Sequence, residues 1–395
     1  MDKFNKKVAC WINRSLFLLV IVVFSAGLCK TLFFPKEIES YENRYANQFK
    51  LPTLNSYLDS TFQDNTEKAL SDQVHLSTTA KKIYNDVNAA VMKQCISWFF
   101  SDSQNYITLK NIDFYHDYLM YSVRDMENVK EPLRQKAQHF NQVFQDNPNV
   151  DFYIYYIEKD TDINFENNQK PHLYEFFRDQ VDLPDDHISR FQIDNFEQFS
   201  QYFYRTDHHW NYKGSYKGYT QVANMLGISD SDLITPVEEV DLNYSFSGSK
   251  ASSSGITNVF TEPFWAYRFD YPPMTITENG ALVDDFGAQN LYFSHQPDTI
   301  SYGSFYGGDS GELVFDTHQE DRDDILIVGE SYDNAILKLL AAHFNKTYSI
   351  DLRNYEAFMG QPFQFSQYLR DHDISKVLLI GNIDYFVMEE FMLRG

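Results

Sequence analysis

The sequence of 395 residues predicts an α/β fold in which a parallel sheet is flanked by helices. An amphipathic pattern at residues 129–144 precedes a β-rich apolar run at 150–157, and a helix before a buried strand is the repeating unit of an α/β layer. Two further apolar strands are expected at 325–328 and 377–380. The elements expected between them are helices near 334–344 and 364–371 and a shorter strand near 347–352. Such alternation of strands and helices is typical of a parallel sheet.

Residues 1–30 predict a membrane anchor. Basic residues lead into an apolar run, and a helix over 8–29 has about 22 residues, enough to cross a bilayer of about 30 Å. The positive flank is expected to stay inside and the rest of the chain outside, as a single-pass protein of the cell membrane. A cleaved signal peptide is the alternative, because Ser25, Ala26 and Gly27 are small and the uncharged core is short.

Residues 31–80 predict a membrane-proximal stalk that leads into short helices, because polar residues dominate and Pro35 and Pro52 interrupt any long helix. Apolar residues at roughly helical spacing over 70–91 predict a packing helix. The remaining chain, residues 81–395, is expected to form one α/β domain.

A β-rich insertion at about 236–320 breaks the alternation of strands and helices. The segment is dense in Ser, Gly, Thr, Asn and Pro, and aromatic residues follow one another quickly between Phe260 and Tyr271. We expect an excursion from the sheet that lines a substrate groove, because aromatic rings offer stacking surfaces for sugars. A surface insertion with its own small core is the alternative.

The charge and cysteine content narrow the class of protein. The 33 basic and 56 acidic residues give a net charge of −23, and no basic cluster outside the amino terminus offers a footprint for nucleic acid. Cys10 and Cys29 fall within or beside the apolar segment, which leaves Cys95 alone in the exported part, so no intramolecular disulfide can form there. A large exported chain without a disulfide is ordinary for a bacterial cell-surface protein.

Residues 205–212 predict a site where protons move, because an Asp and two His between aromatic and turn-forming residues make a poor core. A carboxylate two positions before an imidazole can hold one ring nitrogen and leave the other free to act as a base. Asp207 and His209 have this spacing. His208 and His209 as metal ligands, or as packed surface residues, are the alternatives. We expect no metal, because two adjacent His and one Asp cannot easily all point at one ion.

A candidate nucleophile lies far downstream, where a buried strand ends in Gly329-Glu330-Ser331 and a helix is expected to begin. Such a turn exposes a serine hydroxyl at the carboxyl end of a sheet, near backbone N–H groups that can stabilise an oxyanion. The alternative is that Ser331 is an ordinary helix N-cap, the commonest role of a serine between a strand and a helix.

Together these segments resemble the DHHW proteins, relatives of the SGNH-hydrolase-like alginate O-acetylation proteins. The resemblance is carried by Asp-His-His-Trp at 207–210, Gly-x-Ser-Tyr at 329–332 and residues 350–355, together with 245–249 and 306–308. It implies an SGNH-hydrolase-like sheet, and the chain order Asp, His, Ser leads us to expect that the sheet is circularly permuted. Geometry, not chain order, defines a triad.

Carried over position by position, the resemblance makes Ser331 the nucleophile, His209 the base and Asp207 the residue that orients the base. His208 is the less expected base, because the related motif is Asp-x-His-Trp. Glu330 stands where the hydrolase signature more often has Asp, which leaves the role of this side chain open.

The resemblance also implies donors and substrate contacts around the triad. The Ser331 backbone N–H and Asn382, which follows the last strand, are expected to stabilise the oxyanion, although Gly-Asn pairs also form turns. Arg353 at a strand end is a candidate to bind substrate or the sheet edge. The full set of oxyanion and substrate candidates is Asn382, Arg353, His208, Trp210 and Tyr332.

The expected reaction is acyl transfer through a serine ester, without a cofactor. The resemblance favours O-acetylation of a bacterial cell-surface or exported polysaccharide, with a multi-spanning membrane acyltransferase as the partner that passes acetyl groups across the bilayer. A carbohydrate esterase is the first alternative, because water and a sugar hydroxyl attack the same acyl-enzyme. A non-catalytic polysaccharide-binding or assembly protein of the same fold is the second.

Overall fold

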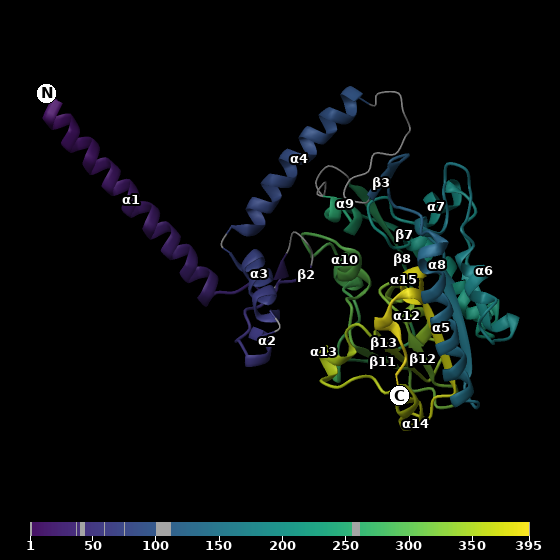
Figure 1. The fold of residues 1–395 in the computed structure, drawn as a ribbon. Helices are drawn as coiled ribbons and strands as arrows, with labels where there is room; N and C mark the ends of the chain where they lie inside the picture. The colour runs from purple at the N-terminus through teal and green to yellow at the C-terminus, as the bar shows by residue number, and fades with distance from the viewer. Residues whose placement is uncertain are drawn as a thin grey trace. The chain divides into compact units, whose positions relative to one another are not determined.

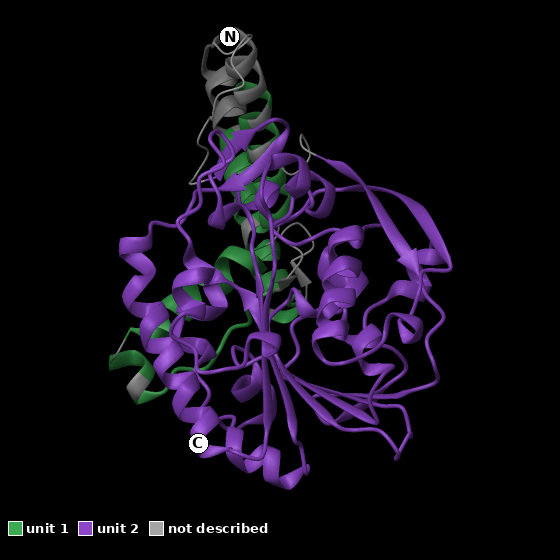
Figure 2. Cartoon of the chain, turned by 90° about the vertical axis from the view of Figure 1, so that its right-hand side faces the viewer, with its two compact units in different colours: residues 1–101 green, residues 102–395 purple. Residues whose placement is uncertain are grey.

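The computed structural model describes residues 2–36, 38–39, 44–58, 60–74, 76–99, 112–254 and 261–394. The chain divides into two compact units, Met1–Ser101 and Asp102–Gly395, which are green and purple in Figure 2. The second unit begins later than residue 81, where the sequence places the start of the α/β domain, because helix α4 (Ser77–Phe99) runs across that position.

The first unit is mainly helical. Helix α1 (Asp2–Phe33) contains the segment Asn13–Thr31, which is long and apolar enough to cross a membrane by length and composition. The helix expected over 70–91 is divided into two, because Leu76 has a φ of 68° and this left-handed conformation interrupts a helix. The other elements of this unit are β1 (Ile38–Glu39), β2 (Arg44–Tyr45), α2 (Leu54–Leu58) and α3 (Thr61–Gln73).

An eight-stranded sheet forms the centre of the second unit, in the order β10-β9-β11-β13-β12-β14-β5-β6. Neighbouring strands from β13 to β6 are parallel. These are β13 (Lys346–Ile350), β12 (Ile325–Val328), β14 (Lys376–Asn382), β5 (Asp151–Ile157) and β6 (Ile188–Phe191). The three strands expected from apolar runs are therefore present, since strands that are covered on both faces need such runs, and so is the shorter strand expected near 347–352.

Three antiparallel strands extend the sheet beyond β13: β11 (Glu312–Asp316), β9 (Thr275–Glu278) and β10 (Ala281–Val283). The expectation that residues 236–320 leave the sheet is therefore wrong for their later part. β9 and β11 bury only alternate side chains, including Ile276, Leu313 and Phe315, so their apolar signal is weak.

The earlier part of this segment does leave the sheet. It forms a separate two-stranded ladder of β7 (Glu238–Phe246) and β8 (Glu262–Arg268). Residues 255–260, which include Phe260 of the aromatic run, lie outside the described residues.

Helices cover both faces of the parallel strands (Figures 1 and 2). Even-numbered residues of β5 pack with helix α5 (Met126–Asp146), whereas its odd-numbered residues pack with α8 (Tyr212–Met225). This alternation is the period-2 geometry of a strand between two layers. The second unit is thus a mixed α/β structure with a large central sheet.

The remaining helices of the second unit are short, and the helix expected near 334–344 is mainly a short 3-10 turn and α12. They are α6 (Leu173–Arg178), α7 (Phe196–Tyr202), α9 (Ser249–Ser254), α10 (Gln289–Phe293), α11 (Tyr302–Tyr306), α12 (Leu337–Ala341), α13 (Tyr355–Met359), α14 (Phe365–Asp371) and α15 (Ile383–Val387). The 3-10 turns are η1 (Asp160–Asp162), η2 (Asp185–His187), η3 (Asp230–Asp232), η4 (Asp333–Ala335) and η5 (Glu389–Phe391). A small hairpin of β3 (Ile112–Tyr115) and β4 (Tyr118–Tyr121) precedes α5.

The strand order reverses at the centre of the sheet. From β12 the chain continues to β13 on one side and then crosses to β14 on the other. In open α/β sheets, ligands bind outside the carboxyl ends of the strands at such a switch point. Ser331, Asn382 and Lys159 follow β12, end β14 and follow β5, respectively, so all three lie at this edge.

Candidate active site

Ser331 lies just beyond the carboxyl end of β12. The strand is fully buried, and Asp333 packs closely on Gly329 after it, since an added Cβ there would lie 2.0 Å from an oxygen of Asp333. The N-cap interpretation of Ser331 is wrong, because Tyr332 is the residue that precedes the 3-10 turn η4. The hydroxyl of Ser331 bonds to His209 instead.

Asp207 is held by a tight local turn in the irregular segment before α8. One of its carboxylate oxygens accepts hydrogen bonds from the His209 backbone N–H at 3.0 Å and from His209 Nδ1 at 2.6 Å. The other oxygen accepts from the Ser249 backbone N–H at 2.7 Å. Gly248 packs against this side chain so closely that a Cβ there would lie 2.3 Å from Asp207 Cβ. Both oxygens of the carboxylate are therefore fixed.

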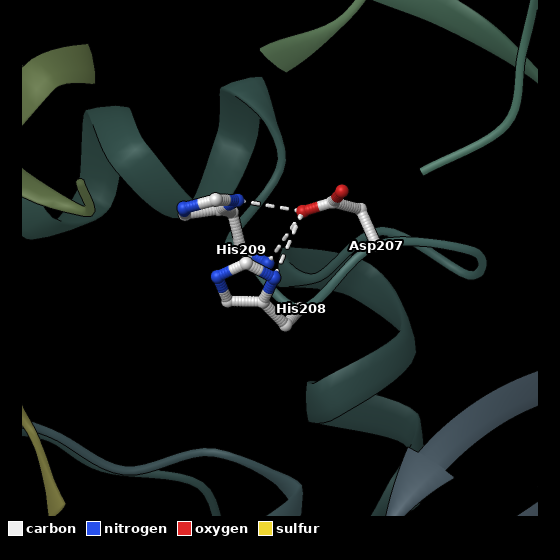
Figure 3. A group of neighbouring side chains, drawn as sticks. All are labelled: Asp207, His208 and His209. Carbon is white, nitrogen blue, oxygen red and sulfur yellow. Dashed lines mark hydrogen bonds and ion pairs between the residues drawn. The ribbon is translucent and has the colours of Figure 1, made fainter. Parts of the chain in front are cut away.

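Asp207, His209 and Ser331 form one continuous chain of hydrogen bonds, the first part of which is visible in Figure 3. His209 Nε2 lies 2.8 Å from Ser331 Oγ, within the hydrogen-bond reach that the triad hypothesis requires. The carboxylate favours a proton on Nδ1, so Nε2 is left to accept from the serine hydroxyl. Burial alone would raise the pKa of Asp207, but the adjacent imidazoles and the Ser249 N–H hold it well below its usual range.

The His209 ring is also held on both faces. The Tyr302 ring lies parallel to it, with centroids 3.7 Å apart and planes 1° apart. The His208 ring covers the other side at 3.8 Å and 36°. Tyr302 lies on α11, within residues 236–320, where the sequence predicts a β-rich insertion. It was missed because nothing in the sequence places α11 against the Asp-His-His-Trp stretch.

Trp210 and Tyr332 connect the backbone segments that carry the site. Trp210 is fully buried, and its indole N–H donates to the Tyr332 carbonyl at 3.1 Å. The Tyr332 hydroxyl in turn donates to the His208 carbonyl. Gly218 of α8 leaves room for the indole, since a Cβ there would lie 2.4 Å from a ring carbon of Trp210. These two sequence candidates hold the segments together and do not face the cavity beside Ser331.

A cavity of about 560 Å³ opens beside Ser331. Four of the sequence candidates line it, namely Ser331, His208, Arg353 and Asn382. The other residues of its wall are Tyr121, Ser122, Arg124, Lys159, Thr161, Glu330, Asp384, Met388 and Phe391. The edge of the sheet at the switch point is therefore hollowed where the hydrogen-bonded serine lies.

Glu330 anchors Asn382. One oxygen of the Glu330 carboxylate accepts both the backbone N–H of Asn382, at 2.9 Å, and its side-chain amide. The Asn382 side-chain oxygen accepts from the Asp384 backbone N–H at 2.9 Å and caps α15. Burial raises the pKa of Glu330, whereas the bond from Asn382 opposes that effect. The longer Glu side chain, which stands where Asp is more common, thus ties β12 to β14.

Arg353 forms ion pairs with acidic neighbours. Its Nε lies 3.0 Å from Asp351 Oδ1 and its Nη2 lies 2.5 Å from Asp351 Oδ2, a two-pronged ion pair. The same Nη2 is 3.6 Å from Asp309. The side chain lines the cavity while its charge is largely matched by these carboxylates.

Three charged residues of the cavity wall were not expected from the sequence, namely Lys159, Arg124 and Asp384. The Lys159 side chain is only 3% exposed, and its ammonium lies 3.4 Å from Asp384 Oδ2. Arg124 Nη2 lies 2.6 Å from the other oxygen of Asp384. A signal was present, because Glu158-Lys159-Asp160 follows an apolar strand just as Ser331 does.

Metal-ligating atoms of Asp207, His208 and His209 lie within 4.8 Å of one another, so these residues do converge, contrary to the expectation from the sequence. Both nitrogens of His209 already have partners in Asp207 and Ser331. An ion bound through His209 would have to replace one of these bonds. The donor set thus fits a proton-transfer chain better than a metal centre.

Comparison with known proteins gives one family. Residues 122–350 match the model of the family described as DHHW protein, which is more than half of the chain. No curated protein sequence matches.

Two solved structures share the fold, and a third is a weaker match. Bacillus cereus PatB1 with a sulfonyl adduct matches with a TM-score of 0.55 and 18% identity, over 74% of this chain and 100% of that one. A DHHW family protein from Eubacterium siraeum DSM 15702 matches with a TM-score of 0.54 and 15% identity, over 74% and 98%. The O-acetyltransferase domain of Pseudomonas putida AlgJ matches with a TM-score of only 0.39 and 13% identity, over 69% and 91%. The fold assignment depends on the first two structures, and by its family match this chain belongs to the DHHW family.

Proposed function

We propose that this chain is an extracytoplasmic serine-dependent acyltransferase that O-acetylates a bacterial cell-surface or exported polysaccharide, on a circularly permuted sheet of the SGNH-hydrolase type. The observation that carries the proposal is the bonded chain Asp207, His209, Ser331 beside a cavity of about 560 Å³. A triad is defined by this geometry and not by the fold on which it stands.

In the first step, Ser331 Oγ attacks the carbonyl carbon of an acetyl donor while His209 Nε2 takes the hydroxyl proton. The bond between the carbonyl carbon and the donor's leaving group breaks, and the leaving group departs with that proton. The product is an acetyl ester on Ser331. Asp207 keeps its negative charge throughout and stabilises the imidazolium that forms.

Two donors are proposed for the oxyanion. The Ser331 backbone N–H has no hydrogen-bond acceptor among the described residues, and it lies next to the carbonyl under attack. The Asn382 amide uses one hydrogen on Glu330 and has a second one to offer. Arg353 and His208, which line the same cavity, are proposed to contact the substrate.

The second step decides between transfer and hydrolysis. A sugar hydroxyl attacks the acetyl ester, His209 takes its proton, and the bond to Ser331 Oγ breaks with return of the proton to the serine. Water attacks in the same way if it enters first. The resemblance of the sequence motifs to those of O-acetylation proteins supports a sugar hydroxyl as the acceptor.

The apolar N-terminal helix supports a proposal for the location and the partner of the chain. We propose that α1 anchors the chain in the cell membrane and that the second unit lies outside. Among the described residues one helix, α1, is apolar enough to span a membrane, so acetyl export requires another protein. A multi-spanning membrane acyltransferase fits that role.

The test uses the detergent-solubilised full chain with p-nitrophenyl acetate, with and without sugar oligomers. Transfer predicts nitrophenol release that rises with oligomer, and acetylated oligomer by mass spectrometry. Release into water alone supports an esterase. No release, with Ser331 also unreactive toward a sulfonyl fluoride, would support a non-catalytic role. Ser331→Ala is the matched control.

A further inference from the structure

We propose that His208 binds a second hydroxyl of the acceptor sugar, adjacent to the one that attacks, so that the site selects vicinal diols. The inference rests on the proposed transferase function and narrows its substrate class. Neither the triad nor the packing described above uses the outward nitrogen of this ring.

His208 has a fixed position in the cavity wall. Its ring lies over His209 with centroids 3.8 Å apart, and it lines the same cavity as Ser331. Its Nδ1 is 2.5 Å from Ser249 Oγ and 3.7 Å from Asp207 Oδ1. In Figure 3 the other ring nitrogen, Nε2, points away from Asp207. Within the described ranges of the chain, Nε2 has no hydrogen-bond partner.

The surroundings make this outward nitrogen an acceptor. The Asp207 carboxylate near Nδ1 favours the proton on that nitrogen, which leaves a lone pair on Nε2. Burial lowers the pKa of His208, and His209, Lys159 and Lys250 lower it further against the opposite effect of Asp207. The ring is therefore neutral near pH 7, and a neutral imidazole accepts a hydroxyl hydrogen.

The chemistry of the second step then defines the ligand. The attacking hydroxyl must direct its hydrogen to His209 Nε2, so it has none left for His208. A hydroxyl on the neighbouring carbon does have one. Because the centroids of the two imidazoles are only 3.8 Å apart, with planes tilted by 36°, oxygens on adjacent carbons can approach one nitrogen each. His208 exchanges no proton, since the proton of the attacking oxygen passes to His209 and returns to Ser331 Oγ as the old ester bond breaks.

The experiment is a competition between two acceptors that differ by one hydroxyl. The full chain is supplied with p-nitrophenyl acetate and equal concentrations of trans-1,2-cyclohexanediol and cyclohexanol, and the two acetates are quantified by mass spectrometry. Because both esters arise from one acyl-enzyme, their ratio does not depend on how fast that intermediate forms. We expect the wild type to favour the diol, after correction for its two hydroxyls, by about 3- to 10-fold, the value of one hydrogen bond.

His208→Phe keeps an aromatic ring over His209 without any nitrogen, and it should abolish this preference. His208→Gln places an amide near the position of Nε2 and should retain part of it. His208→Asn, whose amide reaches only the position of Nδ1, should not. A preference that survives in the Phe and Asn variants, or its absence in the wild type, overturns the inference alone. Failure of the wild type to form any acyl-enzyme overturns the proposed function and this inference with it.

Discussion

His209 is a buried imidazole with a contact on every side. Asp207 and Ser331 occupy its two nitrogens, and Tyr302 and His208 cover its two faces. A ring held in this way has one tautomer and one orientation in the resting state. In such a site, the loss of any one contact should affect the rate more than it affects substrate binding.

Asp207→Asn should lower the rate of acetylation of Ser331 by about 10³- to 10⁴-fold, because an amide at this position favours the wrong tautomer of His209. The measurement is the burst of nitrophenol from p-nitrophenyl acetate. Circular dichroism should show an unchanged fold. A loss of less than tenfold would contradict the assigned role of Asp207.

Tyr302→Leu should lower kcat about tenfold with little change in KM, because it removes the ring that stacks on His209 and stabilises its positive charge in the transition state. Tyr302→Phe keeps the ring and should retain most of the activity. Equal losses in both variants would show that the Tyr302 hydroxyl, which lies 3.4 Å from the Tyr332 carbonyl, is the important group.

At the scale of elements, the site is built from the ends of three parallel strands and two loops. The sequence predicted β12 and β14 closely because each is an apolar run between turn residues. It also predicted the pairing of His209 with Ser331, since both stand in motifs that resemble those of one family. It failed to predict Lys159, because the charged residues that follow β5 belong to none of the motifs that carry the family resemblance, although their place after a buried strand was a signal. It failed for β9 and β11, whose half-exposed faces carry no continuous apolar run.

Gly248→Ala should reduce activity at least tenfold through the loop before α9, because the new methyl group would displace Asp207. Gly308→Ala is a matched control, since its added Cβ would have no atom within 4 Å. The measurement for both variants is the rate at which a sulfonyl fluoride reacts with Ser331. Similar rates in the two variants would show that the loop before α9 accommodates the methyl group without moving the Asp207 carboxylate.

At the scale of the whole molecule, buried charge joins parts of the second unit that are far apart in sequence. Lys136 of α5 is almost fully buried, and its ammonium donates to the Met388 carbonyl at 2.9 Å. His139 Nε2 lies 2.6 Å from the Leu393 carbonyl. The C-terminal segment is held against α5 by these contacts, and the same segment supplies Met388 and Phe391 to the cavity wall.

Lys136→Met should stabilise the protein at pH 7, by about 1 to 3 kcal/mol, and should reduce the pH dependence of stability. Burial lowers the pKa of Lys136 to about 7, against an ordinary value of about 10.4. Between these values the unfolded chain binds more protons than the folded one, so wild-type stability should rise with pH across that window. Urea unfolding at pH 7 and pH 9 measures the slope. An identical slope in the variant would assign the effect to other groups.

The hydrogen bond between His209 and Ser331 joins residues 122 positions apart, one on the loop before α8 and the other on the turn after β12. Nucleophilicity at Ser331 is consequently a property of the assembled tertiary structure, and no folding intermediate that lacks this contact can have it. The time course of Ser331 labelling during refolding would therefore report when the tertiary structure of the domain forms. The time at which the serine becomes reactive marks the moment when the helical layer has docked on the sheet.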